Sequence, residues 1–217
     1  MPRVSNPVFS TCAQLTIASS PLLVRQPADE HHHAHLRRLR CASLRQQARS
    51  RASQFHFLAG YTSKTPGTED GVLEPLPTFS TCYSAPFLVC HPSRYATMLA
   101  EKMEATKANC WLINTGWTGG KYGTGRRCPL KYTRAIIDAI HDGSLAQAGF
   151  VKFDVFGLWI PTTCNVVPEE ILDPRKAWSD KAAFQKEVRK LGAMFRKAFS
   201  LYEREVLDKV KLAGPVN

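Results

Sequence analysis

The sequence predicts an α/β fold, and three consecutive stretches carry this prediction. Residues 110–115, "CWLINT", form a short apolar run with a glycine directly after it, which is typical of a buried strand. The glycine-rich stretch 116–127, "GWTGGKYGTGRR", comes next, and the following "YTRAIIDAIHDG" has helical spacing. Strand, glycine loop and helix in this order predict a ligand crevice at the carboxyl end of the strand.

The elements before this unit are predicted from apolar runs and spacing. Residues 85–90, "APFLVC", predict a short buried strand. A helix should follow from Pro92, with Ser93 as its N-cap. Its apolar positions recur at helical spacing and favour a core face: Tyr95, Met98, Leu99 and Met103.

The elements after the glycine loop are two helices with a strand between them. Pro129 suits a first helical turn, and Gly143 ends the helix that carries Ile136, Ile137 and Ile140. Residues 150–161, "FVKFDVFGLWIP", alternate as a half-buried strand does. Ser179 can cap a C-terminal amphipathic helix, whose apolar stripe is Phe184, Val188, Leu191, Phe195, Phe199 and Tyr202.

The glycine-rich stretch places Gly120 and Gly125 at the spacing of the first part of the phosphate-binding pattern G-x-x-x-x-G-K-[ST]. Arg126 and Arg127 stand where that pattern has Lys and Ser or Thr. Two interpretations therefore remain open. The stretch is either a true phosphate-binding loop of this kind, or a glycine-rich surface turn with two solvated arginines.

Composition divides the 217-residue chain near Ser53 and predicts two regions, 1–54 and 55–217. Residues 1–54 contain eight Arg, no Lys and no Gly, and Asp29 and Glu30 are their acids. Residues 1–54 therefore contribute +6 to the formal net charge of +11. We expect a basic, poorly ordered segment that attracts polyanions, but its few aromatic residues disfavour a dedicated nucleic-acid site. The histidine tract at 31–35, "HHHAH", predicts incidental metal affinity.

The cysteines indicate a reducing compartment. They contain no C-x-x-C pair, which argues against a zinc ribbon and a disulfide framework: positions 12, 41, 82, 90, 110, 128 and 164. There is no run of 18 apolar residues, so no membrane partner is expected. The Arg-rich N-terminus is weakly similar to a transit peptide, but its prolines disfavour an early helix. The expected location is cytoplasmic.

Three stretches together closely resemble the ATP-dependent phosphoenolpyruvate carboxykinases: "FHFLAGYTSKTPGTEDGVLEPLPTFSTCYSAPFLVCHPSRYA", "WLINTGWTGGKYGTGRRCPLKYTRAIIDAIHDGSL" and "ILDPRKAW". The likeness runs from about Phe55 almost to the C-terminus. It implies that residues 55–217 form part of a mononucleotide-binding C-terminal domain, roughly the final third of such an enzyme. Residues 1–54 do not resemble the family. The likeness also implies a lyase of gluconeogenesis that converts oxaloacetate and ATP into phosphoenolpyruvate, carbon dioxide and ADP.

The resemblance assigns nucleotide contacts to particular residues. Arg127 and Cys128 match family positions that contact ATP beside the base, and Thr133 matches a further ATP contact. Cys128 stands where the family often has an aliphatic residue. Phe87 aligns with an aromatic near the adenine. The family also needs Mn²⁺ or Mg²⁺, but its phosphate-binding loop and metal ligands correspond to no stretch of this chain, so no metal ligand and no catalytic residue is assigned here.

These observations leave three hypotheses of function. The chain is a catalytically incomplete carboxykinase that takes ATP and oxaloacetate in the complete enzyme, with a homo-oligomer left open. Alternatively, it is a non-catalytic module for nucleotide binding or subunit interaction. The third hypothesis, ranked last, is binding of nucleic acid by the basic segment. A partial domain would leave apolar faces and sheet edges uncovered, so we expect low solubility.

Overall fold

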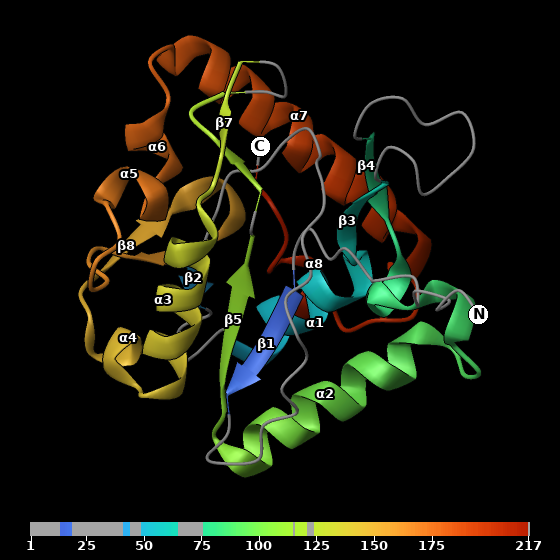
Figure 1. Ribbon diagram of the computed structural model, residues 1–217. Helices are drawn as coiled ribbons and strands as arrows, with labels where there is room; N and C mark the ends of the chain where they lie inside the picture. The colour runs from blue at the N-terminus through green and yellow to red at the C-terminus, as the bar shows by residue number, and fades with distance from the viewer. Residues whose placement is uncertain are drawn as a thin grey trace, which may run out of the picture.

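The computed structural model describes residues 14–18, 41–43, 49–64, 76–114, 116–120 and 124–216 (Figure 1). The histidine tract, the tip of the glycine-rich stretch and most of the basic segment lie outside these residues. The described part is mixed helix and strand, as the sequence predicted. Helix α1, Arg49–Ala59, runs across the predicted division between residues 54 and 55.

A five-stranded sheet in the order β1-β5-β2-β9-β8 forms the centre of the fold. All its neighbouring strands are antiparallel. The strands in this order are Gln14–Ala18, Asn109–Ile113, Cys41–Ser43, Leu158–Pro161 and Phe150–Phe153. Strand β5 is therefore the predicted strand at 110–115, and it is paired on both edges.

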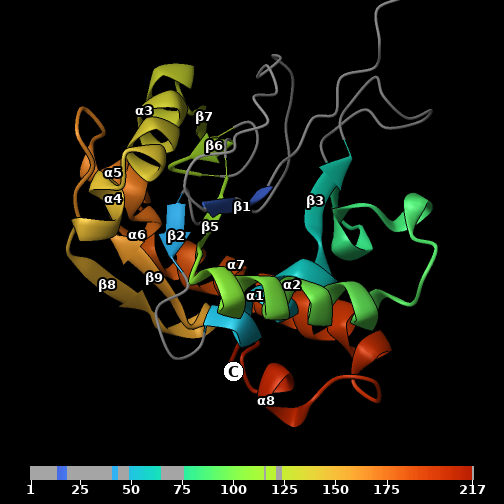
Figure 2. The same cartoon turned by 90° about the horizontal axis from the view of Figure 1, so that it is seen from below.

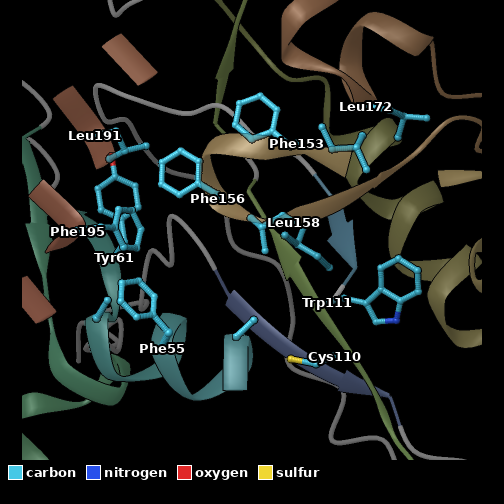
Figure 3. Packing of buried hydrophobic residues seen from close by; sticks show 14 of the residues in the cluster. Phe55, Tyr61, Cys110, Trp111, Phe153, Phe156, Leu158, Leu172, Leu191 and Phe195 are labelled. Carbon is cyan, nitrogen blue, oxygen red and sulfur yellow. The ribbon is translucent and has the colours of Figure 1, made fainter. Parts of the chain in front are cut away.

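Helices lie on both sides of β5. Figures 1 and 2 agree in placing α3, Leu130–His141, and α4, Ser144–Gln147, on one side of it. Helices α1 and α2, Pro92–Thr106, lie on the other side. Both Cys110 and Trp111, successive residues of β5, are buried (Figure 3). Helices on both faces explain why the strand is a continuous apolar run rather than an alternating one.

Aromatic side chains of the core pack around Phe195 of α7, Lys181–Phe199. The ring centroid of Phe195 lies 5.3 Å from that of Tyr61 and 5.5 Å from that of Phe156. Figure 3 shows these rings together with Phe55 between α1 and α7. Aromatic pairs at such distances add to the area they bury. The predicted apolar stripe of α7 is buried from Phe184 to Phe199, which confirms that part of the prediction. Tyr202, the last predicted member, lies beyond the end of α7 and is half-buried.

Three helices form where they were predicted, although two begin with different caps. In α2 the prediction of a core position is wrong for Met98, which is 48% exposed. Helix α3 buries Ile136 and Ile140, as expected. In α2 the N-cap is His91 and not Ser93. His91 Nδ1 accepts the Ser93 N–H at 3.3 Å. In α7 the carboxylate of Asp180, not Ser179, accepts the Ala183 N–H at 2.9 Å. An N-cap side chain must reach the amide two or three residues ahead, and these two residues stand at that distance.

Two strand predictions are wrong. Residues 85–90 contain the 3₁₀ helix η2, Ala85–Phe87, and expose both Phe87 and Val89. Residues 150–161 form two paired strands, β8 and β9, joined by the 3₁₀ helix η3, Asp154–Phe156, and Gly157. Gly157 has φ +62°, a left-handed conformation that ends an extended strand.

Smaller elements complete the described chain. Strands β3, Tyr61–Lys64, and β4, Leu76–Phe79, pair with each other, as do β6, Trp117–Thr118, and β7, Arg126–Arg127. The short helices are α5, Glu169–Leu172, α6, Pro174–Ala177, and α8, Asp208–Lys211. The remaining 3₁₀ helices are η1, Thr81–Tyr83, and η4, Ser200–Tyr202. No helix of the described residues has the length and apolarity to cross a membrane.

Candidate nucleotide site

The glycine-rich stretch forms a hairpin that projects from the carboxyl end of β5. Trp117 pairs with Arg127 and Thr118 with Arg126. At the base of this hairpin the Cys128 N–H donates to the carbonyl oxygen of Gly116 at 2.8 Å. The Gly116 N–H in turn donates to Asn114 Oδ1 at 3.2 Å. These bonds fix the hairpin between the end of β5 and the start of α3.

Two glycines allow the arms of the hairpin to approach each other. A Cβ on Gly125 would lie 2.7 Å from the carbonyl oxygens of both Thr118 and Gly120. A Cβ on Gly120 would lie 2.9 Å from the amide nitrogen of Gly125. Side chains are excluded at both positions because these neighbours are backbone atoms. The Gly120 and Gly125 spacing thus has a structural cause within the hairpin itself.

The hairpin forms one wall of a cavity of about 240 Å³. The opposite wall comes from Glu170 of α5 and Ala177 of α6. A Cβ on Gly119 would lie 3.3 Å from the carbonyl oxygen of Ala177, so the two walls are in close contact there. The hairpin contributes the remaining lining residues: Thr118, Gly119, Thr124, Gly125 and Arg126. The cavity thus combines a cation, a carboxylate and hydroxyl groups, so its lining is polar and carries both signs of charge.

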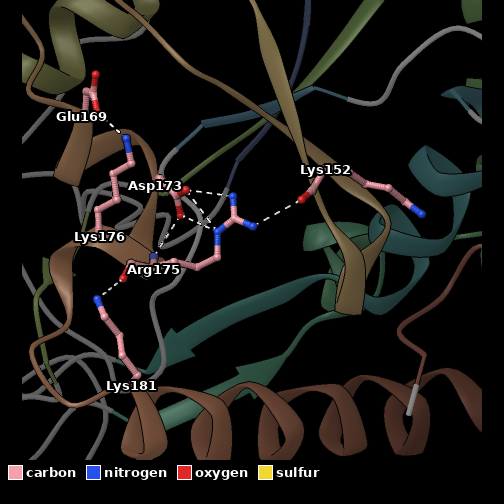
Figure 4. Close-up of polar contacts among 6 residues, drawn as sticks. All are labelled: Lys152, Glu169, Asp173, Arg175, Lys176 and Lys181. Atoms are coloured by element: carbon pink, nitrogen blue, oxygen red, sulfur yellow. Dashed lines mark hydrogen bonds and ion pairs between the residues drawn. The ribbon is translucent and has the colours of Figure 1, made fainter.

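A clamp between Asp173 and Arg175 holds the second wall (Figure 4). Asp173 Oδ1 accepts the Arg175 N–H at 2.9 Å and so caps α6. Arg175 Nε donates to both carboxylate oxygens, at 2.9 and 3.1 Å, and Nη2 donates to Oδ2 at 2.8 Å. The hydrogen bonds with Asp173 raise the pKa of Arg175 above its ordinary value. The guanidinium also lies 5.7 Å from the ring centroid of Phe153, which ties α6 to β8.

Three of the four predicted site residues lie in one segment of the sequence, and none of the four lines the cavity. Arg127 is exposed on β7, and Cys128 is buried at the hairpin base, where its thiol donates to the Pro129 carbonyl oxygen at 3.6 Å. Thr133 is buried in α3. Phe87 is not brought to them, because the segment between β4 and α2 lies on the opposite side of the molecule from α3 in both views (Figures 1 and 2).

Sequence reasoning missed the second wall of the cavity. Glu170 and Ala177 follow the hairpin by more than 40 residues, and no short-range spacing connects them to it. The stretch "ILDPRKAW" contains Ala177, but it contributed only to the family resemblance and not to a site. An Asp two residues before an Arg, at the start of a short helix, was the one local indication of the clamp.

The thiols and candidate metal ligands give no further site in the described part of the chain. Cys82, Cys90, Cys110, Cys128 and Cys164 are free thiols. Burial raises the pKa of Cys110 to about 12 and that of Cys82 to about 11, so both stay protonated at neutral pH. Among the described residues, no group of three His, Cys, Asp or Glu side chains could hold a metal ion. The residues present there do not fit a divalent metal.

Curated relatives of known name match most of the chain. Phosphoenolpyruvate carboxykinase (ATP) of Neurospora crassa is 54% identical over 169 residues, which are 77% of this chain and 28% of the relative. The protein of the same name from Candida glabrata is 55% identical over 163 residues, 74% of this chain and 30% of the relative. That from Zea mays is 49% identical over 170 residues, 75% of this chain and 26% of the relative. The chain thus spans less than a third of the length of each.

A family model supports the same assignment. The model for phosphoenolpyruvate carboxykinase matches residues 46–170, which include β5, the hairpin, α3 and Glu170. Its match begins nine residues before the predicted boundary at residue 55. Since it covers more than half of the sequence, the chain belongs to the family of ATP-dependent phosphoenolpyruvate carboxykinases.

Proposed function

We propose that this chain carries the ATP-binding side of a phosphoenolpyruvate carboxykinase, whose complete form converts oxaloacetate and ATP into phosphoenolpyruvate, carbon dioxide and ADP. The observation that carries the proposal is the glycine hairpin that ends in Arg126 and Arg127 and lines a cavity. Backbone can approach a ligand closely at the glycines, and guanidinium groups neutralise phosphate charge. The family membership supports the identity of the ligand.

The residues of the segment and of the opposite wall differ in what their positions support. Arg127 is exposed, so its guanidinium can stack on a purine or pair with a phosphate oxygen. The Cys128 N–H is donated to Gly116, so a main-chain contact of Cys128 with the nucleotide would use its carbonyl oxygen, whatever its side chain. Thr133 is buried at the beginning of α3, and its nucleotide contact rests on the family resemblance alone. Glu170 adds an acceptor on the opposite wall, where an exocyclic amine of adenine could donate to it.

We further propose that the 217-residue chain does not complete the reaction alone. Charge on the enolate and on the transferring phosphoryl group must be neutralised, which in this chemistry requires a divalent metal. The described residues contain no cluster that fits such an ion. The stretch aligned with the relatives is also only 26% to 30% of their length. A non-catalytic module for nucleotide binding or subunit interaction is the second candidate function, since it needs the hairpin cavity but no metal site.

Calorimetry with ATP tests the nucleotide role. We expect weak binding that falls at least tenfold in Arg127→Ala, because a charge-assisted hydrogen bond to a ligand is worth roughly 1.5–3 kcal/mol. The matched control is Arg189→Ala, which removes one exposed arginine from α7 and should leave the affinity unchanged. Absence of ATP binding by the unaltered chain would exclude this role.

A turnover assay separates the two candidate functions. The purified chain is given oxaloacetate, ATP and Mn²⁺, and phosphoenolpyruvate formation is followed. We expect none, and robust turnover would refute the claim of incompleteness. Turnover that appears only when the remaining part of a carboxykinase is added would favour the enzyme over the non-catalytic module.

A further inference from the structure

Helix α7 exposes a surface that carries only positive charge. Its apolar stripe is buried in the core, and the one acid in its sequence, Glu187, is only 6% exposed. The helix runs along one border of the molecule in Figure 1. We call its five exposed and solvated cations the basic face: Lys186, Arg189, Lys190, Arg196 and Lys197. This face lies outside the nucleotide site.

The cations of the basic face form two rows along the helix. Because an α-helix has about 3.6 residues per turn, residues seven apart lie almost in line on its surface. Arg189 and Arg196 therefore stand in one row, and Lys190 and Lys197 stand in the other. Small exposed residues lie between the rows: Ala182, Ala193 and Ser200. At about 1.5 Å per residue, the basic face is roughly 16 Å long.

The charges of the basic face are not neutralised within the described part of the chain. The ion pairs found there join other residues, and none includes a cation of this face. The nearest acids in sequence outside α7, Asp180 and Glu203, stand beyond its two ends. Like charges four residues apart, such as Lys186 and Lys190, destabilise a helix. The stability of α7 therefore does not explain why the cations are gathered on one face.

The composition of the basic face favours a nucleic acid over a membrane or a protein. A helix that lies on a membrane inserts its apolar side chains, but those of α7 pack in the core around Phe195. A protein interface has an apolar or aromatic centre, whereas the centre of this face holds Ala193 and Ser200. Contact with a nucleic-acid backbone needs neither, because Lys and Arg bind the phosphates directly.

The aromatic side chains of α7 favour a duplex over a single strand. Proteins hold single strands by stacking the bases on exposed aromatic rings. All three aromatic residues of α7 are buried: Phe184, Phe195 and Phe199. A duplex offers a regular array of phosphates that can be bound without contact to the bases, and a guanidinium can donate to two phosphate oxygens at once. Charge complementarity is thus sufficient for binding.

We propose that the basic face of α7 binds the phosphate backbone of duplex nucleic acid without reading its sequence. The attraction for polyanions expected from composition concerned residues 1–54, whereas this face lies on a helix that is packed against the core. It also follows the stretch that the family model matches, residues 46–170. The inference goes beyond the proposed function, since it uses neither Arg127 nor the hairpin cavity.

Fluorescence anisotropy with a labelled DNA duplex of mixed sequence and the full chain, without ATP, tests this proposal. We expect binding whose affinity falls steeply as the KCl concentration rises, because bound phosphates release their counterions. The triple variant Lys186→Gln, Lys190→Gln and Lys197→Gln should lower the affinity at least tenfold. It should also reduce the slope of log K against log [KCl] by about 2–3, since each phosphate contact contributes about 0.9 to that slope.

Two controls separate the basic face from net charge. The triple variant Lys102→Gln, Lys107→Gln and Lys209→Gln removes equal charge from exposed positions outside α7, and it should change the affinity less than threefold. At the exposed Ala193, the variant Ala193→Glu places a carboxylate between the two rows of cations and should lower the affinity at least fivefold. Ala193→Gln introduces a side chain of the same size without charge, so it should stay within twofold of the unaltered chain.

Several outcomes would overturn the inference. Absence of duplex binding would do so, as would equal losses in the two triple variants, which would assign the binding to net charge or to residues 1–54. Tighter binding to a single strand, or to vesicles that contain phosphatidylserine, would show that the ligand is of another kind.

Crossed measurements separate this inference from the proposed function. Arg189→Ala should weaken duplex binding alone, and Arg127→Ala should weaken ATP binding alone. A chain that binds the duplex through α7 but binds no ATP would refute the nucleotide role and leave the inference intact. Loss of duplex binding in Arg127→Ala would place the duplex at the hairpin and overturn the inference.

Discussion

His56 of α1 is a histidine enclosed by aromatic rings. Its ring centroid lies 5.5 Å from those of Phe55 and Phe195, both edge-on. Neither ring nitrogen has a hydrogen-bond partner in the described part of the chain. Burial lowers the pKa of His56 from 6.5 to about 4, because a charged imidazolium would lose its water without gaining a partner.

We expect His56 to make the chain sensitive to acid. Between pH 6.5 and 4 the unfolded chain binds the imidazole proton and the folded chain does not, so stability falls as the pH falls through this range. From pH 6.5 to pH 5 the loss should be about 2 kcal/mol. Urea unfolding measures it. His56→Leu should flatten the pH dependence, while His141→Gln, at an exposed histidine of α3, should retain it. Parallel pH profiles for the two variants would contradict the expectation.

At the hairpin, a single methyl group should separate the arms. In Gly125→Ala the new Cβ would meet two carbonyl oxygens at 2.7 Å, so the pairing of β6 with β7 must open. We expect the amide-exchange protection of residues 126–128 to fall at least tenfold, about 1.4 kcal/mol. Gly192→Ala is the control, since its Cβ meets nothing closer than 3.5 Å and lies in a helix. Unchanged protection in Gly125→Ala would show that the hairpin tolerates a side chain.

At the scale of elements, the clamp between Asp173 and Arg175 should contribute more to the free energy of unfolding than the ion pair between Lys176 and Glu169. Arg175→Met leaves the Asp173 carboxylate, which is only 9% exposed, without its guanidinium partner, at an expected cost of about 1–3 kcal/mol. Lys176→Met breaks the neighbouring contact with Glu169, in which both side chains are largely exposed, and should cost less than about 1 kcal/mol. Chemical denaturation gives both values. Equal losses would show that the clamp contributes no more than a surface pair.

The elements also show which sequence patterns predict secondary structure correctly. Helices α3 and α7 were predicted because their apolar residues repeat over three or more turns, so one strongly amphipathic face can be buried. The run at 85–90 was misassigned because apolarity predicts burial only where other polypeptide covers the segment, and here Phe87 and Val89 are exposed. The run at 150–161 was misassigned because its alternation continues through a turn at Gly157.

In the candidate site, too, some residues could be predicted from the sequence and others could not. Arg127, Cys128 and Thr133 lie within seven residues, so one strand–loop–helix unit brings them together, and their nucleotide role remains a prediction. The wall with Glu170 and Ala177 could not be predicted, since it depends on how α5 and α6 fold back on the hairpin. Contacts of that kind come from tertiary packing, which a single sequence does not reveal by its local spacing.

At the scale of the whole molecule, the low solubility expected from the sequence can be related to particular surfaces. The five-stranded sheet has β1 and β8 at its two edges. An edge strand offers unpaired backbone groups to another chain, and charged side chains on it discourage such pairing. Strand β8 carries Lys152, which is exposed beside Asp154 with their charged atoms 3.5 Å apart.

We therefore expect Lys152 to prevent the edge of β8 from pairing with a strand of another molecule. In Lys152→Val we expect larger species to accumulate as the protein concentration rises, since the strand would become uniformly apolar at its edge. Sedimentation velocity follows their formation. Lys186→Val removes the same charge from the exposed face of α7, so it lowers the net charge of +11 equally without altering a sheet edge. If the two variants associate to the same extent, reduced charge repulsion rather than strand pairing is the cause, and exposed apolar side chains such as Val89 and Leu201 become the more important source of self-association.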